Sequence, residues 1–157
     1  MQNRMRTHPL SEEQISRLLR LAQTGSLATL NPDGTPYCTP IHFVWFEGAI
    51  FFHGLQEGKK LDNIARDPRV GFTVYELHEL LLDPSGKPCG TNTKYESVIL
   101  SGRAEPVEGI EEKRNVLREI VKKYTPQLAS TDILGDMMES TAVVRIDILE
   151  LTGKYYS

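Results

Sequence analysis

The sequence predicts a small antiparallel β-barrel with flanking helices, built as a single domain. Three short strands joined by tight turns follow the first helix, and three further strands lie later in the chain. The strands do not alternate regularly with helices, as a doubly wound sheet would require. The 157 residues, of which 39% are hydrophobic and 25% charged, are enough for one hydrophobic core.

The first helix is predicted over residues 12–23. Ser11 can cap its start, and Gln14 can reach back to the cap from the third helical position. Apolar residues then recur at helical spacing, at Ile15, Leu18, Leu19 and Ala22. Gly25 is a plausible C-cap.

A meander of three strands is predicted next, over residues 26–30, 36–46 and 49–53, because the connections have the composition of short turns. In the second strand, Ile41, Phe43 and Trp45 share one face, and His42, Val44 and Phe46 share the other. Both faces are largely apolar, so neither is simply solvated. One face can line a barrel, while the other must meet a helix, a ligand or a second subunit.

The remaining elements complete six strands. They are predicted as a helix over 59–66, a strand over 70–75, a long loop over 77–93, a strand over 95–105, a helix over 110–124, a short helix over 130–138 and a strand over 142–151. Residues 1–9 are expected to form a frayed arm.

Composition excludes several classes of protein. The formal net charge of −3 argues against a general nucleic-acid binder, which needs a basic surplus. No segment has the length and hydropathy of a membrane span or a secretory signal. Two cysteines, Cys38 and Cys89, make no disulfide framework and are expected to be free thiols in a reducing compartment. A soluble cytoplasmic protein is therefore expected.

The segment from Phe52 to Ile64 carries the strongest chemical signal. A strand ends in a loop bounded by Gly54 and Gly58, and Lys59 and Lys60 then open a helix. Backbone N–H groups at a helix N-terminus together with cationic side chains suit a phosphate. A nucleotide-triphosphate P-loop is excluded, because only three residues separate the glycines and a second lysine follows the first. A solvated lysine pair on a surface helix is the alternative.

The histidines differ in their surroundings. His42 and His53 lie on apolar strands, so each is either hydrogen-bonded in the core or pointed at a ligand. His8 and His78 are expected to be structural or at the surface. Cys38 and His42 would lie roughly 13 Å apart on one strand, too far to share an ion, and no metal site is predicted.

The order of these segments resembles the pyridoxamine 5'-phosphate oxidase-like flavin proteins. Within them, it is most similar to the Nim branch of 5-nitroimidazole resistance proteins. The segments that carry the resemblance are 26–30, 33–37, 40–44, 50–54, 58–64, 67–70, 95–99 and 102–104, and the similarity runs from about Ser11 to Leu151.

The resemblance implies a six-stranded antiparallel split barrel of the FMN-binding type, forming a homodimer with two FMN sites at the subunit interface. The implied cofactor-binding residues are Thr39, Pro40, Ile41, His42, Phe43, Val44, Phe52, His53, Gly58, Lys59, Lys60 and Ser97. Ser97 would reach the cofactor of the other subunit, and the lysine pair would grip the phosphate.

The chain also departs from the oxidase that names the family. Thr39 stands where that enzyme has an arginine, and Lys59 replaces the arginine of its phosphate-binding pair. Lysine offers a point charge without the bidentate fork of arginine. The substrate-binding segment at the C-terminus of the oxidase is not recognisable, which argues against oxidation of pyridoxamine phosphate.

The function expected from these features is that of an FMN-dependent oxidoreductase that reduces a small electrophile, such as a nitro compound. His53 is the candidate catalytic residue, as a polar group near the flavin ring. The first alternative is a non-enzymatic flavin or haem protein, for storage or sensing, with His42 or His53 as an axial ligand. A deazaflavin is a further possible cofactor, and a barrel that binds partners without a cofactor is the last alternative.

Overall fold

The computed structural model describes residues 7–133 and 135–157. It has one antiparallel sheet of seven strands in the order β2-β1-β5-β6-β7-β4-β3. The strands are β1 (Thr24–Leu30), β2 (Pro36–His42), β3 (Val44–Phe46), β4 (Ala49–Leu55), β5 (Arg69–Leu81), β6 (Asn92–Pro106) and β7 (Thr141–Tyr156). The helices are α2 (Glu12–Leu21), α3 (Lys59–Arg66), α4 (Ile110–Tyr124) and α5 (Gly135–Ser140), with 3₁₀ turns at Pro88–Gly90 and Pro126–Leu128.

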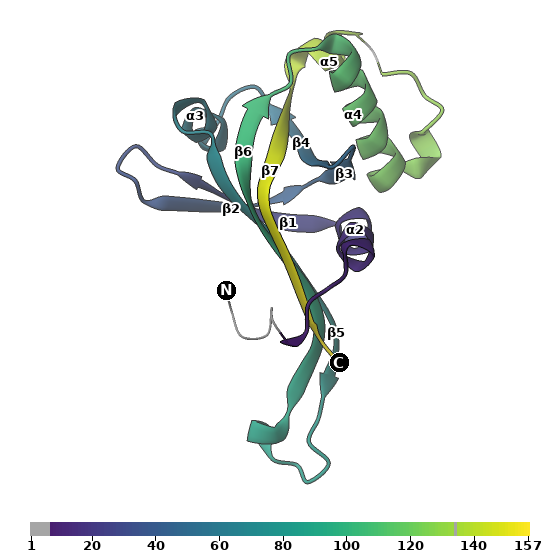
Figure 1. Ribbon diagram of the computed structural model, residues 1–157. Coiled ribbons are helices and arrows are strands. Elements are labelled where there is room, and N and C mark those ends of the chain that lie inside the picture. Colours follow the sequence, from purple (N-terminus) through teal and green to yellow (C-terminus); the bar gives the residue numbers. More distant parts are fainter. Residues whose placement is uncertain (1–6, 134) are drawn as a thin grey trace.

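The sheet is coiled into a split barrel with helices around it (Figure 1). The barrel core includes Leu27, Phe43, Ile50, Phe52, Phe72, Val98 and Ile146, each at most 2% exposed. A second apolar cluster, with Val44, Phe51, Val116 and Val143 as members, packs α4 and α5 against the outside of the sheet. The antiparallel split barrel with flanking helices is thus confirmed.

The prediction of one strand over 36–46 was wrong, and the sheet has seven strands instead of six. The chain is interrupted at Phe43, so that β2 pairs with β1 while β3 pairs with β4. These two short strands are the opposite edges of the sheet, and a single residue joins them. β2 also approaches β4, so the sheet curls round at this point without a hydrogen-bonded closure. The predicted division of faces is correct: Ile41 and Phe43 belong to the barrel core, and Val44 to the second cluster.

The predicted loop over 77–93 was also wrong in extent. β5 runs on to Leu81 and β6 begins at Asn92, so only the tip of the segment is a loop. The two strands form a long hairpin arm that extends away from the barrel (Figure 1). The pairing shifts between Leu77 and Glu79, which leaves His78 as the extra residue of a β-bulge.

Helices α3 and α4 have the predicted bounds, whereas α2 and α5 do not. The capping box of Ser11 and Gln14 is present, but α2 ends at Leu21 with Ala22 as its C-cap. Gly25 lies in β1, where a Cβ atom would come within 2.2 Å of the ring of Phe72. The predicted helix over 130–138 lies instead at Gly135–Ser140.

The predicted N-terminal arm lies mostly outside the described residues. Of its last residues, His8 accepts a hydrogen bond at its backbone carbonyl from the N–H of Tyr155, and Pro9 pairs with Lys154.

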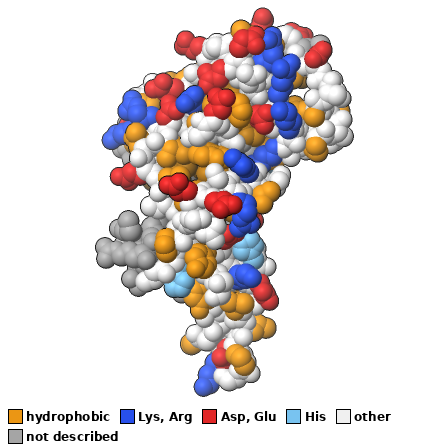
Figure 2. All heavy atoms as spheres, turned by 45° about the vertical axis from the view of Figure 1, so that its right-hand side comes forward, with side chains coloured by type: hydrophobic (Ala, Val, Ile, Leu, Met, Phe, Trp, Pro, Cys, Tyr) orange, Lys and Arg blue, Asp and Glu red, His pale blue; other side chains and the backbone are white. Residues whose placement is uncertain are grey.

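Among the described residues, no helix is both long and apolar enough to cross a membrane. Figure 2 shows both acidic and basic side chains over the helical end of the molecule.

Candidate functional site

Two histidines come together on the outside of the barrel. His42 ends β2, and His53 lies on β4, which β2 approaches. Both residues are exposed, and the ring of His42 lies 5.0 Å from that of Tyr124. Desolvation, and to a smaller extent the charge of His42, lower the pKa of His53 below its usual value. The lowered pKa favours the neutral form of His53, which can both donate and accept a hydrogen bond.

The N-terminus of α3 lies beside the same strands. Gly58 is its N-cap, with a φ of 138° that favours glycine. The Gly58 carbonyl accepts from the N–H groups of Leu61 and Asp62, so the N–H groups of Lys59 and Lys60 have no partner inside the helix. A helix of eight residues with these free donors has the local chemistry of an anion site.

The two lysines point to different neighbours. The Nζ atom of Lys59 lies 4.7 Å from the centre of the Tyr37 ring on β2. The Nζ atom of Lys60 lies 3.8 Å from the place where a Cβ atom would stand on Gly54 of β4. The positive charges are therefore placed over β2 and β4, which also carry the two histidines.

The predicted cofactor residues fall into two groups. Ile41, Phe43, Val44 and Phe52 are buried in the apolar clusters. Thr39, Pro40, His42, His53, Gly58, Lys59 and Lys60 are half-buried or exposed. Contacts link parts of the second group: Lys59 lies over Tyr37 of β2, Lys60 lies beside Gly54 of β4, and β2 approaches β4. Within the buried group, Ile41, Phe43 and Phe52 belong to the barrel core, and Val44 belongs to the second cluster.

Ser97 does not lie in that group, since it belongs to β6, opposite Tyr75 on β5 and Lys154 on β7. It is 5% exposed, and its Oγ atom has no hydrogen-bond partner in the described chain. Buried polar atoms are almost always bonded. The orphaned Ser97 hydroxyl is therefore a buried polar group that a ligand could satisfy.

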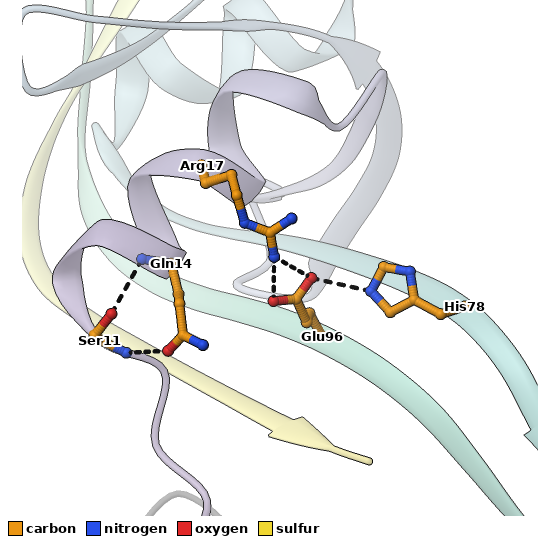
Figure 3. Close-up of polar contacts among 5 residues, drawn as sticks. All are labelled: Ser11, Gln14, Arg17, His78 and Glu96. Carbon is orange, nitrogen blue, oxygen red and sulfur yellow. Dashed lines mark hydrogen bonds and ion pairs between the residues drawn. The ribbon is translucent and has the colours of Figure 1, made fainter.

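Next to Ser97, Glu96 connects three elements (Figure 3). Its carboxylate accepts two hydrogen bonds from Arg17 of α2, at 2.6 and 2.8 Å, and lies 3.0 Å from Nε2 of His78 at the β-bulge. Sequence reasoning did not identify this cluster, because its members are 18 and 79 residues apart. The cluster fixes the base of the hairpin arm against α2.

Sequence reasoning also missed the last turn of α4, which holds the junction between β2 and β3. The Phe43 N–H donates to Oη of Tyr124 at 2.9 Å, and Nζ of Lys123 donates to the Phe43 carbonyl at 2.9 Å. The sequence indicated only the apolar spacing of this helix and not these contacts.

No group of three or more His, Cys, Asp or Glu side chains in the described ranges is placed to hold a metal ion. Cys38 and Cys89 are exposed free thiols.

Solved structures with the same fold include proteins of several descriptions. A candidate 5-nitroimidazole antibiotic resistance protein from Bacteroides thetaiotaomicron is 23% identical, with a TM-score of 0.78 over 94% of this chain and 86% of that one. A flavocytochrome from Azotobacter vinelandii is 22% identical, with a TM-score of 0.80 over 94% and 68% of the two chains. An FAD and haem binding protein from Mycobacterium smegmatis is 19% identical, with a TM-score of 0.83 over 94% and 72%. At these identities the likeness establishes the fold.

A search of curated proteins finds no match. The family model described as pyridoxamine 5'-phosphate oxidase, in contrast, matches residues 11–155, nearly the whole chain. The likeness that the order of sequence segments suggested is thereby confirmed, and the chain belongs to the pyridoxamine 5'-phosphate oxidase family.

Proposed function

We propose that this protein binds FMN and acts as an FMN-dependent oxidoreductase on a small electrophile such as a nitro compound. The observation that carries the proposal is the N-terminus of α3, where two free backbone N–H groups and two lysines stand together. A phosphate monoester matches this arrangement in charge and in hydrogen bonding. Riboflavin lacks that phosphate, so it serves as the matched control ligand.

The surface beside the phosphate site suits a flat ring. It lies on the outer side of β2 and β4, where Pro40, His42 and His53 are exposed. A bound flavin would supply hydride transfer, while the protein orients it and tunes it by hydrogen bonds. Because desolvation lowers the pKa of His53 and so favours its neutral form, it can donate to the ring edge or to a substrate without placing a positive charge there.

The site is proposed to be completed by a second copy of the chain. The orphaned Oγ atom of Ser97 would bond the cofactor held by the partner subunit. The hairpin arm carries Tyr75, Leu77, Leu80 and Leu82, each more than half exposed, and Figure 2 shows hydrophobic side chains along it. Exposed apolar patches of this kind mark interfaces. Analytical ultracentrifugation should therefore show a dimer, and Leu77→Glu should shift it toward the monomer.

Two measurements test the flavin proposal. FMN should bind about 100-fold or more tightly than riboflavin, because the phosphate makes several charge-assisted hydrogen bonds. Equal affinities would contradict the phosphate site. The reduced holoprotein should then transfer electrons to a nitroaromatic compound, and His53→Gln should slow the transfer more than it weakens FMN binding. A holoprotein without such transfer would leave flavin binding intact but contradict the reductase.

A flavin or haem protein without catalysis is the second candidate. Its support is the pair of neighbouring histidines and the fold shared with a flavocytochrome and with an FAD and haem binding protein. Haem titration distinguishes the two functions. A Soret band that is lost in His42→Ala or His53→Ala would favour haem, whereas flavin binding without haem binding would exclude it.

A further inference from the structure

A pocket of about 530 Å³ lies where α2, β3 and α4 meet. It is lined by Arg20, Val44, Trp45, Phe46, Glu47, Gly48, Glu119, Lys122 and Lys123. Apart from the buried Val44, none of the residues predicted to bind the cofactor lines it. Its volume lies within the range of small-molecule sites.

Lys123 is the central feature of this pocket. Its Nζ atom donates to the Phe43 carbonyl at 2.9 Å and to the Leu19 carbonyl at 3.5 Å, and it lies 4.1 Å from the centre of the Phe43 ring. An ammonium group has three N–H donors, so one remains for a further partner. No carboxylate of the described chain pairs with it. A half-buried cation that lacks a counter-ion is costly, and a bound anion would relieve that cost.

The other charged groups around the pocket leave it with a positive surplus. Lys122 pairs with Glu119 at 2.6 Å, so these two charges cancel. Arg20 has no hydrogen-bond or ion-pair partner among residues 7–133 and 135–157. Glu47, in the turn between β3 and β4, is the remaining acidic residue. Two cations, Arg20 and Lys123, thus face one carboxylate.

An aromatic residue of β3 supplies an apolar surface. Trp45 is half-buried and lines the pocket beside the cations. The neighbouring Phe46 packs against the second apolar cluster on the opposite face of the strand. A planar ring stacks favourably on a side chain such as that of Trp45. The combination of an aromatic wall with two unpaired cations selects a ligand that has both a ring and a negative charge.

We propose that this pocket is a second ligand site, which binds a small aromatic carboxylate. The carboxylate accepts from the free N–H of Lys123 and from Arg20, while the ring lies against Trp45. The site is independent of the flavin proposed above, since Lys59, Lys60 and His53 do not line it. Failure of one site in an experiment therefore leaves the other testable.

The probe is benzoate, and the reporter is the fluorescence of Trp45, the single tryptophan of the chain. The full-length protein should show saturable quenching with benzoate. Benzamide, which keeps the ring without the charge, and acetate, which keeps the charge without the ring, should each bind about tenfold or more weakly. Equal binding of benzoate and benzamide would overturn the proposal.

Variants locate the binding. Lys123→Met and Arg20→Gln should each weaken benzoate binding about tenfold, whereas Lys113→Met, on the same helix but outside the pocket, should not. Unchanged affinity in both pocket variants would overturn the proposal. Should Lys123→Met fail to fold, as judged by circular dichroism, Arg20→Gln decides the outcome, and Lys123→Arg should retain binding.

The pH dependence gives an independent readout. Burial lowers the pKa of Lys123 to about 8, so benzoate affinity should fall as the pH rises from 7 to 9. The other charged groups that face the pocket are Arg20, Glu47, Glu119 and Lys122. An affinity that stays constant up to pH 9 would contradict a role for Lys123.

Discussion

The hydroxyl of Tyr124 reaches both backbone polar groups of Phe43, the single residue that joins the two edges of the sheet. The Phe43 N–H donates to it at 2.9 Å, and it lies 2.7 Å from the Phe43 carbonyl oxygen and 2.7 Å from that of Gln23. Phe43 belongs to no strand, so its backbone has no ladder partner. The last turn of α4 replaces that partner and fixes His42, the preceding residue.

Tyr124→Phe should therefore destabilise the protein by about 1–3 kcal/mol, because it leaves a buried N–H group without an acceptor. The free energy of unfolding, measured with urea, checks this. Tyr95→Phe is the matched control, since the ring of Tyr95 stacks on Tyr75 and has no comparable backbone role. Equal stabilities of the two variants would contradict the role of Tyr124.

Lys123 predicts how stability depends on pH. Burial lowers its pKa from 10.5 to about 8 in the folded protein, so between these values the unfolded chain binds more protons. The free energy of unfolding should rise as the pH increases from 8 toward 10.5. Below pH 8, Lys123 is charged in the folded protein, and the full cost of its partial burial lowers the stability. The gain should be about 1–2 kcal/mol, less than the full shift implies, because the side chain is only half-buried.

Lys123→Met should abolish this rise in unfolding free energy, whereas Lys122→Met, which removes an exposed lysine paired with Glu119, should keep it. Urea unfolding at several pH values between 7 and 10.5 provides the measurement. If the unfolding free energy of Lys123→Met still rises with pH, another titrating group causes the rise.

The lysines of α3 are predicted to recognise the phosphate and not the ring. Lys59→Met and Lys60→Met should each weaken FMN binding about tenfold, since each removes one charge-assisted contact. Riboflavin binding should change little in either variant. Lys87→Met, in the tip of the hairpin arm, serves as the control. Equal losses for FMN and riboflavin would indicate a structural role for the lysines.

Ser97 offers a test of the dimeric site. Ser97→Ala removes a buried hydroxyl without a partner, so the cofactor-free protein should lose no stability. If Ser97 bonds the partner's cofactor, FMN affinity should fall about five- to tenfold. Ser101→Ala, an exposed position on the same strand, should leave the affinity unchanged. An unchanged FMN affinity in Ser97→Ala would place the cofactor elsewhere.

Local signals in the sequence were sufficient to predict the bounds of some helices. Lys59–Arg66 and Ile110–Tyr124 were predicted with their observed bounds, because glycine precedes each helix and proline follows it closely. The division of faces along residues 41–46 followed from the two-residue period of a strand. The free N–H groups at Lys59 and Lys60 likewise follow from helix geometry alone.

The remaining features depend on contacts between distant residues. No turn signal divides residues 36–46 in the sequence, and only the pairing of β2 with β1 and of β3 with β4 separates them into two strands. The hairpin arm contains Pro84, Gly86 and Pro88, which favour a loop locally, but these residues occupy only its tip. Tyr124 and Phe43 are 81 residues apart, and no periodicity indicates such a bond.

The proposal that this chain binds a flavin can be tested on the purified protein. Its absorbance spectrum, together with mass identification of the released cofactor, provides the measurement. We expect flavin absorption bands and about one FMN released per chain. A colourless protein that takes up no FMN on titration, or one that carries only haem, would contradict it.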